Sequence, residues 1–198
     1  MIIAVGAEAI IKREGNILHK ERIPKLYRLG VIDEALRKKR TKSEARNIDR
    51  AGKVVSAPKL YEVKDTTIVM DFIDGITLRD CLEKVDRKKI FERIGKDTRK
   101  MHDANLVHGD LTTSNLIIKK DEPYFIDFGL SFVSAKTEDK AVDIHLMKQA
   151  LESKHNDFSE ECFSAFMKGY NPDKEFIERL IKVENRGRYK RKHSKLQS

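Results

Sequence analysis

The sequence contains no tryptophan and only two cysteines, and it has no long hydrophobic run. Cys81 and Cys162 are far apart and have no metal-ligating neighbours, so reduced, partly buried thiols are expected instead of a disulfide framework. No stretch of about 18 apolar residues is present, and no transmembrane helix is expected. The apolar start of the chain lacks the basic region and cleavage site of a signal peptide. The sequence therefore predicts a cytoplasmic protein that does not associate with a membrane.

The balance of charges is basic, with 41 Lys and Arg against 32 Asp and Glu and a net charge of +9. The excess is concentrated at residues 37–42 and in the C-terminal segment Arg186–His193. Basic clusters of this kind attract phosphate groups. Charge alone leaves the other interpretation open, which is a solvated helix face and a disordered tail.

The pattern of the 198 residues changes near residue 74. Before it, apolar runs separated by turn signals such as Glu14-Gly15-Asn16 indicate strands around one helix. The expected strands are 2–5, 9–12, 17–20, 59–63 and 67–72, and the expected helix is 33–51. We predict an N-terminal lobe over residues 1–73, made of an antiparallel sheet and one helix.

After residue 74 the pattern is mainly helical. The expected helices are 77–82, 86–102, 140–153, 159–170 and 172–184, with short strands at 116–119 and 124–126. We predict a reduced, helical C-terminal lobe over residues 74–185 and a basic tail over residues 186–198. The predicted fold class is α+β.

The most informative stretch runs from His108-Gly109-Asp110 to Asn115 and is followed twelve residues later by Asp127-Phe128-Gly129. Together the two segments match the catalytic loop and the magnesium-binding Asp-Phe-Gly of kinases, which predicts a minimal bilobal protein-kinase-like fold. Phosphoryl transfer requires positioning and charge neutralisation, and Mg²⁺ requires hard oxygen ligands. We expect Asp110 to orient the attacking hydroxyl or water, and Asn115 and Asp127 to hold Mg²⁺.

A kinase-like N-terminal lobe also needs a lysine on its third strand and a glutamate on its helix. Lys20 ends the third expected strand, and Glu44 lies on the expected helix. We expect Lys20 to contact the phosphates of ATP and to pair with Glu44, although Glu21 and Lys25 are rivals for these roles.

Two further segments are expected to bind ATP. Gly6 lies where a phosphate-covering loop belongs, in a segment with one glycine. The residues expected at the hinge, whose backbone N–H and C=O groups would bind the adenine edge, are Met70, Asp71, Phe72 and Ile73.

Several segments closely resemble one family, the small atypical kinase of the KEOPS (EKC) complex, and the resemblance covers essentially the whole chain. The segments that carry it are Gly6-Ala7-Glu8-Ala9, Lys25-Leu26-Tyr27-Arg28, Arg40-Thr41-Lys42-Ser43-Glu44-Ala45-Arg46, the stretch from His108 to Asn115, Asp127-Phe128-Gly129-Leu130-Ser131, Glu138-Asp139-Lys140-Ala141-Val142-Asp143 and the basic tail. The spacing Arg-Thr-x-x-Glu-x-Arg separates this family from ordinary kinases.

The resemblance implies an atypical Ser/Thr kinase that autophosphorylates in isolation and acts as an ATPase in the complex. It implies work beside the tRNA threonylcarbamoyladenosine-forming enzyme and the other KEOPS subunits, in support of tRNA modification. It further implies that the tail contacts tRNA or the partner enzyme. The residues expected in that contact are Arg186, Arg188, Lys190, Arg191 and Lys192.

The chain departs from an ordinary protein kinase in its activation segment. Gly109 replaces the arginine before the catalytic Asp, and only fifteen residues separate Asp127 from Asp143. No Ala-Pro-Glu follows, which favours water or an unusual acceptor over a peptide substrate. We expect Asp143 to accept backbone N–H bonds from the catalytic loop, His108 to hold this loop, and His102 to pack or cap its helix.

Two other functions stay open on the sequence alone. One is a RIO-type or small-molecule, aminoglycoside-type phosphotransferase with the same His-Gly-Asp loop. The other is a nucleotide-dependent scaffold that grips tRNA through the tail.

Overall fold

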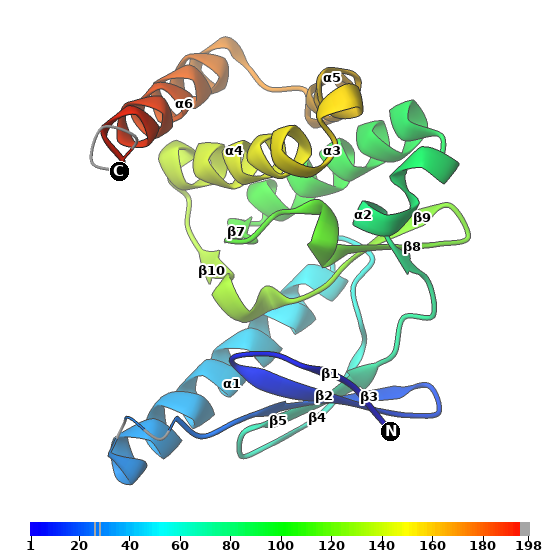
Figure 1. Ribbon diagram of the computed structural model, residues 1–198, viewed down its shortest axis with the longest axis vertical. Helices are drawn as coiled ribbons and strands as arrows, with labels where there is room; N and C mark the ends of the chain where they lie inside the picture. Colours follow the sequence, from blue (N-terminus) through cyan, green and yellow to red (C-terminus); the bar gives the residue numbers. More distant parts are fainter. Residues whose placement is uncertain (26, 28, 195–198) are drawn as a thin grey trace.

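A computed structural model describes residues 1–25, 27 and 29–194, with side chains described up to Arg186. The first part of the chain forms a sheet with one long helix beside it, and the rest forms a mainly helical part (Figure 1). This arrangement confirms the predicted α+β fold class. The division at residue 74 into two domains stays a prediction.

The N-terminal sheet has five antiparallel strands in the order β1-β2-β3-β5-β4. Its strands are β1 (Ile2–Val5), β2 (Ala9–Glu14), β3 (Ile17–Arg22), β4 (Leu60–Lys64) and β5 (Thr67–Asp71). Gly15 has a φ of 58° in the turn between β2 and β3, which explains glycine there. Helix α1 (Gly30–Gly52) follows β3 and contacts β4 and β5. All of these elements were predicted, with ends that differ by a few residues.

The C-terminal part contains five helices and five short strands among the described residues. Its helices are α2 (Leu78–Cys81), α3 (Arg87–Asp103), α4 (Thr137–Lys154), α5 (Ser159–Tyr170) and α6 (Lys174–Ser194), with short 3₁₀ turns at Leu82–Lys84, Thr113–Asn115, Phe128–Leu130 and Asn156–Phe158. Its strands are β6 (Ile76–Thr77), β7 (Leu106–Val107), β8 (Leu116–Lys119), β9 (Glu122–Phe125) and β10 (Phe132–Val133). They form one sheet in the order β6-β8-β9 and one β7-β10 pair. The two-residue strands β6, β7 and β10 were not predicted, because two residues carry no periodicity.

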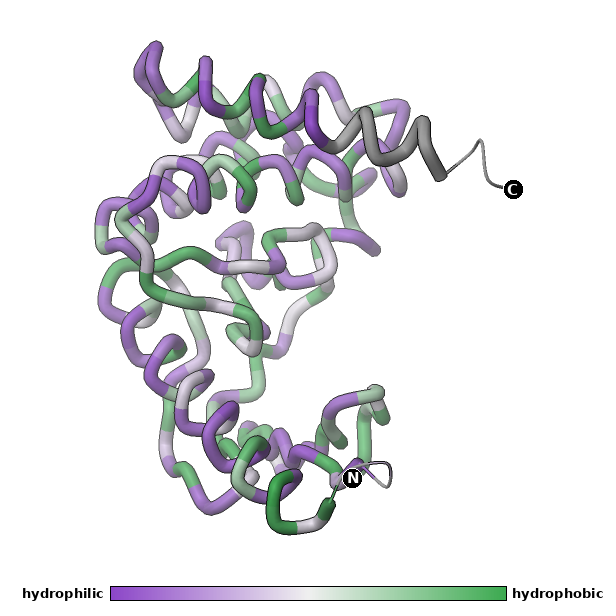
Figure 2. Tube along the Cα trace, turned by 90° about the vertical axis from the view of Figure 1, so that its left-hand side faces the viewer, coloured by the Kyte–Doolittle hydropathy of each residue, from purple (hydrophilic) through white to green (hydrophobic). Residues whose placement is uncertain are grey.

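The core of this part lies where α3 and α5 pack together. Hydrophobic and hydrophilic residues alternate along the helix that leads to the C-terminus (Figure 2). Phe91 and Ile94 of α3 and Cys162 and Phe166 of α5 are completely buried. Cys162 and Cys81 are both free and buried, as expected. Burial raises the pKa of the Cys162 thiol to about 11, so this thiol stays protonated at neutral pH.

The last helix differs from the prediction. The expected helix 172–184 extends as α6 to Ser194, so the backbone of most of the basic tail is helical. Phe176, Leu180 and Val183 are buried at helical spacing, and α6 packs on α4. Arg186 pairs with Glu138 of α4 at 2.6 Å. The side chains of Arg188, Lys190, Arg191 and Lys192 lie outside the described residues.

No helix in the described part of the chain combines the length and the apolar character that a membrane span requires.

The close approach of α3 and α5 generates a prediction about glycine. A Cβ added at Gly169 would lie 1.9 Å from the carbonyl oxygen of Glu92, and one added at Gly52 would have nothing within 4 Å. Gly169→Ala is therefore expected to lower the free energy of unfolding by about 1–3 kcal/mol, because the two helices must separate. Gly52→Ala, the control, is expected to cause no loss. Equal urea unfolding midpoints for the two variants would contradict this packing.

Candidate active site

Lys20 joins three segments that are far apart in the sequence. Its Nζ lies 2.6 Å from Glu44 Oε1 on α1 and 2.7 Å from Asp127 Oδ1 after β9. The rivals have other partners, since Glu21 pairs with Lys12 and Lys25 with Glu8. Burial alone lowers the pKa of Lys20, but the two carboxylates outweigh it and hold the pKa above its ordinary value. The ammonium is therefore charged at neutral pH and available for a phosphate.

The segment between β7 and β8 carries the predicted catalytic loop. Asn115 Nδ2 donates to Asp110 Oδ2 at 2.8 Å and to the backbone oxygen of Asp110 at 2.9 Å. The 3₁₀ turn Thr113–Asn115 brings the two residues together, which explains their spacing of five. One carboxylate oxygen of Asp110 is thereby fixed, and the whole side chain is restrained.

Asp143 anchors this loop from α4. Its two carboxylate oxygens accept the backbone N–H groups of His108 at 2.8 Å and Gly109 at 2.9 Å. Asp143 is completely buried, and His102 Nε2 lies 3.2 Å from its Oδ2. The expected role of Asp143 as an acceptor for the loop backbone is confirmed.

The structure gives a steric reason for the glycine at position 109. Gly109 has a φ of 80°, a conformation that L side chains rarely adopt. A Cβ there would lie 2.3 Å from the carbonyl oxygen of Leu130. The arginine that ordinary kinases carry before the catalytic Asp therefore cannot fit unless the chain after Asp127 moves.

Asp127 also has unusual backbone geometry. Its φ is 59° and its ψ is 71°, and its Oδ1 accepts the N–H of Gly129 at 3.3 Å. A non-glycine residue in this region carries conformational strain, which concentrates at functional sites. Burial raises the pKa of Asp127, but Lys20 and the N–H of Gly129 outweigh it and hold the pKa below its ordinary value. Asp127 is thus an anion at neutral pH.

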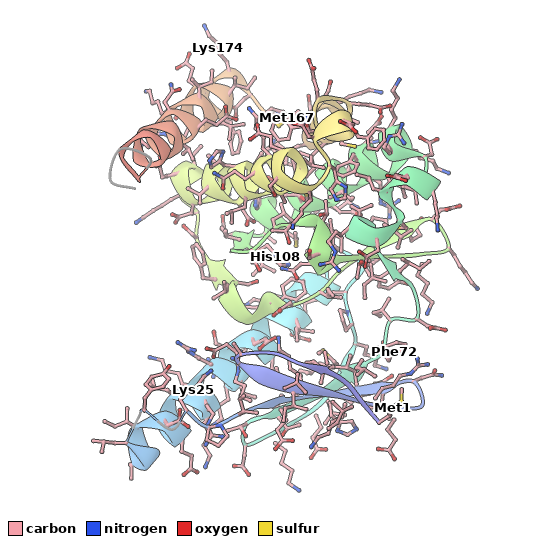
Figure 3. All side chains as sticks on the ribbon, viewed as in Figure 1. Met1, Lys25, Phe72, His108, Met167 and Lys174 are labelled. Carbon is pink, nitrogen blue, oxygen red and sulfur yellow. The ribbon has the colours of Figure 1, made fainter. Side chains whose placement is uncertain are left out.

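His108 lies at the centre of the molecule, below α4 (Figure 3). Its Nε2 donates to the carbonyl oxygen of Ile126 at 3.1 Å, and its ring lies 5.0 Å from that of Phe128. Its own carbonyl accepts from Ser131 Oγ at 2.6 Å. His108 therefore ties the catalytic loop to the Asp127 segment, and His102 packs between Asp143 and Tyr170.

A cleft of about 650 Å³ brings several predicted residues together. Its lining includes Gly6, Lys20, Asp110 and Asp127 from the prediction, together with Glu8, Arg22, Arg40 and Gly129. The sequence signals for the unpredicted cations were present. Arg22 lies two positions after Lys20, on the same face of β3, and Arg40 begins the Arg-Thr-x-x-Glu-x-Arg motif.

The predicted hinge is not among the residues that line this cleft. Met70 and Ile73 are buried, and the N–H groups of Asp71 and Phe72 donate to the carbonyl oxygens of Lys59 and Asn16. The Asp71 carboxylate accepts the N–H of Lys59 at 3.1 Å. Binding of adenine at this segment stays a prediction.

The oxygen donors of Asn115 and Asp127 fit Mg²⁺. Asn115 contacts Asp110 through Nδ2, which leaves its amide oxygen for another partner. Asp127 is held through Oδ1, which leaves Oδ2 for a metal ion. No group of three or more His, Cys, Asp or Glu in the described part could hold a metal ion, so phosphate and water would supply the remaining ligands.

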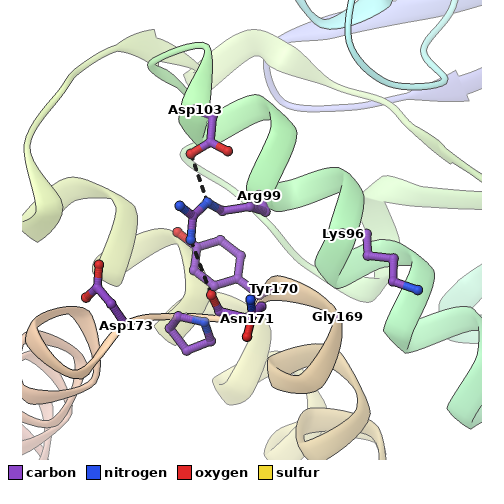
Figure 4. Close-up of a pocket in the computed structure, with 8 residues that line it drawn as sticks. Lys96, Arg99, Asp103, Gly169, Tyr170, Asn171 and Asp173 are labelled. Carbon is purple, nitrogen blue, oxygen red and sulfur yellow. Dashed lines mark hydrogen bonds and ion pairs between the residues drawn. The ribbon is translucent and has the colours of Figure 1, made fainter.

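A second hollow of about 630 Å³ lies between α3 and the connection from α5 to α6 (Figure 4). The two hollows have similar volumes, but different residues line them. Arg99 is held by Asp103 at 2.8 Å and by the carbonyl oxygen of Asn171 at 3.3 Å. None of the predicted catalytic or metal-binding residues lines this hollow.

The fold has the architecture of a RIO-type kinase. A Rio2 kinase from Chaetomium thermophilum, solved as an ADP/Mg²⁺-phosphoaspartate complex, is similar with a TM-score of 0.67 over 94% of this chain and 70% of that chain. At 14% identity the likeness concerns the fold alone. The RIO domain family matches residues 28–160. The predicted protein-kinase-like fold is confirmed.

Relatives define the family more closely. The chain is 42% identical to the KEOPS complex subunit Bud32 of Pyrococcus abyssi, over 88% of this chain and 85% of that protein. It is 37% identical to a probable serine/threonine-protein kinase BUD32 homolog of Archaeoglobus fulgidus, over 96% of both. It is 41% identical to a probable bifunctional tRNA threonylcarbamoyladenosine biosynthesis protein of Methanothermobacter thermautotrophicus, over 95% of this chain and 36% of that protein. The chain belongs to the Bud32 family of RIO-domain kinases, which confirms the resemblance.

The shared carboxylate of Glu44 generates a prediction about stability. Glu44 is 1% exposed and pairs with both Lys20 and Arg22. Glu44→Gln is expected to lower the free energy of unfolding by about 3 kcal/mol, because Arg22 loses its buried carboxylate and Lys20 loses one of its two carboxylates. Glu34→Gln, which removes the exposed pair with Lys38, is the control and is expected to change little. The measurement is chemical denaturation, and a similar loss in both variants would argue against this role of Glu44.

Proposed function

We propose that this chain binds Mg-ATP in the cleft and transfers or hydrolyses its terminal phosphate, as an atypical Ser/Thr protein kinase with ATPase activity. The observation that carries the proposal is the convergence of Lys20, Glu44 and Asp127 beside the Asp110–Asn115 pair. Cation, metal donors and carboxylate base are the parts that phosphoryl transfer requires.

Each group of the site has one role in phosphoryl transfer. Lys20 keeps its bond to Glu44 and directs its remaining N–H donors at the first phosphates of the nucleotide, near Gly6. Asn115 and Asp127 would hold Mg²⁺, which would neutralise charge on the phosphates. Asp110, fixed at one oxygen by Asn115, accepts the proton of the attacking hydroxyl or water. In this proposal the adenine extends beyond the lining of the cleft to the hinge segment, residues 70–73.

The acceptor is water or an unusual hydroxyl in this proposal. Gly109 has no guanidinium with which to hold a loop phosphate, and a side chain at that position meets the carbonyl oxygen of Leu130. The chain from Asp127 reaches α4 at Thr137 within ten residues, which leaves little length for a peptide-docking platform.

The names of the relatives extend the proposal to partners. One relative is a KEOPS complex subunit and another is a bifunctional tRNA threonylcarbamoyladenosine biosynthesis protein. We infer that this chain works in the cytoplasm as a KEOPS subunit beside the tRNA threonylcarbamoyladenosine-forming enzyme. In this setting ATP cleavage supports tRNA modification.

Removal of either carboxylate tests the chemistry. Asp110→Asn and Asp127→Asn are expected to reduce Mg²⁺-dependent ATP turnover, measured as phosphate release and autophosphorylation, by at least about 100-fold. Asp49→Asn, on the exposed surface of α1, is the control and is expected to retain turnover. Full turnover in both cleft variants would refute the catalytic assignment. Nucleotide binding without any turnover in the unaltered chain would favour a nucleotide-dependent scaffold. Transfer to small amino sugars would favour a small-molecule phosphotransferase.

The basic tail is proposed to bind tRNA. Arg186 lies on α6, and Arg188, Lys190, Arg191, Lys192 and Lys195 follow it in the sequence. A chain that ends after Arg186 keeps the buried residues of α6 and the pair with Glu138, so it is expected to fold.

The tail generates a prediction about salt dependence. In the assembled complex, removal of the five cations after Arg186 is expected to weaken tRNA binding and to reduce the slope of log K against log salt by up to about 4. The measurement is a salt titration of tRNA affinity. The control variant, Lys88→Gln and Lys89→Gln on the exposed face of α3, removes two cations and is expected to reduce the slope by less for each cation removed. An unchanged slope after truncation would remove the tail from the tRNA contact.

A further inference from the structure

Glu8 places a carboxylate at the cleft, on the loop between β1 and β2. Three cations converge on it. Arg40 NH1 lies 3.0 Å from Glu8 Oε2, Lys25 Nζ lies 3.6 Å from Glu8 Oε1, and Arg22 NH1 lies 4.0 Å from Glu8 Oε2. We call these four residues the Glu8 cluster. Three cations around one carboxylate form an arrangement that also suits a phosphate group.

Arg22 lines the cleft and is held in place by Glu44 of α1. Its side chain is 7% exposed, and its NH2 group donates to Glu44 Oε2. Its Nε is buried, and the described residues offer it no hydrogen-bond partner. A buried guanidinium N–H without an acceptor is costly, and a bound anion is one way to satisfy it.

Lys25 and Arg40 approach Glu8 from two other elements. Lys25 lies on the segment between β3 and α1 (Figure 3), and its Nζ also donates to the carbonyl oxygen of Ala7. Arg40 extends from α1 and lines the cleft. The loop that carries Glu8 is therefore pinned to both the strand and the helix that bear the predicted phosphate-binding residues.

The Glu8 cluster is displaced along β3 from Lys20. Residues i and i+2 of a strand share a face and are about 7 Å apart, which describes Lys20 and Arg22. A phosphate chain whose first groups contact Lys20 and which runs along β3 would reach Arg22 and its neighbours with its terminal group. A diphosphate would be too short to do so.

We propose that Glu8 is an internal stand-in for the terminal phosphate of a nucleoside triphosphate. When the triphosphate binds, its terminal phosphate displaces the Glu8 carboxylate and takes Arg22, Lys25 and Arg40 as partners. The loop between β1 and β2 is then released from α1. The Glu8 cluster thus makes the cleft selective for triphosphate over diphosphate, an inference that rests on the proposed function.

Removal of the competing carboxylate tests this directly. Glu8→Gln is expected to tighten binding of a non-hydrolysable ATP analogue about tenfold and to leave the affinity for ADP unchanged, both measured by calorimetry with Mg²⁺ on the full chain. Glu21→Gln is the matched control, because Glu21 lies on the opposite face of β3 and pairs with Lys12. The control is expected to change neither affinity.

Removal of a cation gives the converse test. Arg40→Gln is expected to weaken the analogue about tenfold with little effect on ADP, whereas Arg46→Gln, an exposed arginine of the same helix, is expected to have no effect. In the double variant Glu8→Gln/Arg40→Gln, the two changes are expected to be non-additive, because both groups act at one position.

The outcomes separate the inference from the proposed function. If Glu8→Gln changes both affinities equally, or neither, the stand-in role is overturned while nucleotide binding stands. If the unaltered chain binds neither nucleotide, the proposed function fails as well. Selective tightening of the triphosphate, lost when Arg40 is also replaced, supports the inference.

Discussion

The architecture depends on one ammonium group that is shared by two carboxylates. Lys20 of the sheet contacts Glu44 of α1 and Asp127 of the helical part, so a single charge links three segments. A neighbouring contact runs in parallel, since Asn47 of α1 donates to the carbonyl oxygen of Ser131 at 2.7 Å. These groups are charged or buried and polar, so each needs its partner to offset the cost of its removal from water. Replacement of one of them therefore destabilises the contact between the sheet part and the helical part.

The predicted catalytic loop is held through its backbone as well as through its side chains. Asp143 accepts two consecutive N–H groups, and Gly109 adopts a conformation reserved largely for glycine. Such fixed backbone geometry places Asp110 without an activation loop that must first be ordered.

Much of the fold follows from the sequence, because α3 and α5 have clear helical periodicity and the turn signal at residues 14–16 separates β2 from β3. The Asp110, Asn115 and Asp127 spacing also led to residues that lie together. Other features depend on tertiary contacts that no local pattern carries. The strands β7 and β10 exist only because they pair with each other, and the hinge N–H groups are engaged by Lys59 and Asn16. Arg22 was overlooked because the expected strand ended at Lys20 and a charged residue beyond it ordinarily indicates a solvated surface, yet this one lies on β3 and is buried against Glu44.

The helical course of α6 has a mechanical consequence. The 21 residues of α6 form a helix about 31 Å long, and its first turns pack on α4. A flexible segment of the same composition would sample many directions and would lose conformational entropy on meeting a polyanion. A helix has one direction, and packing on α4 fixes it, so the backbone after Arg186 continues to Ser194 along a line set by the rest of the molecule.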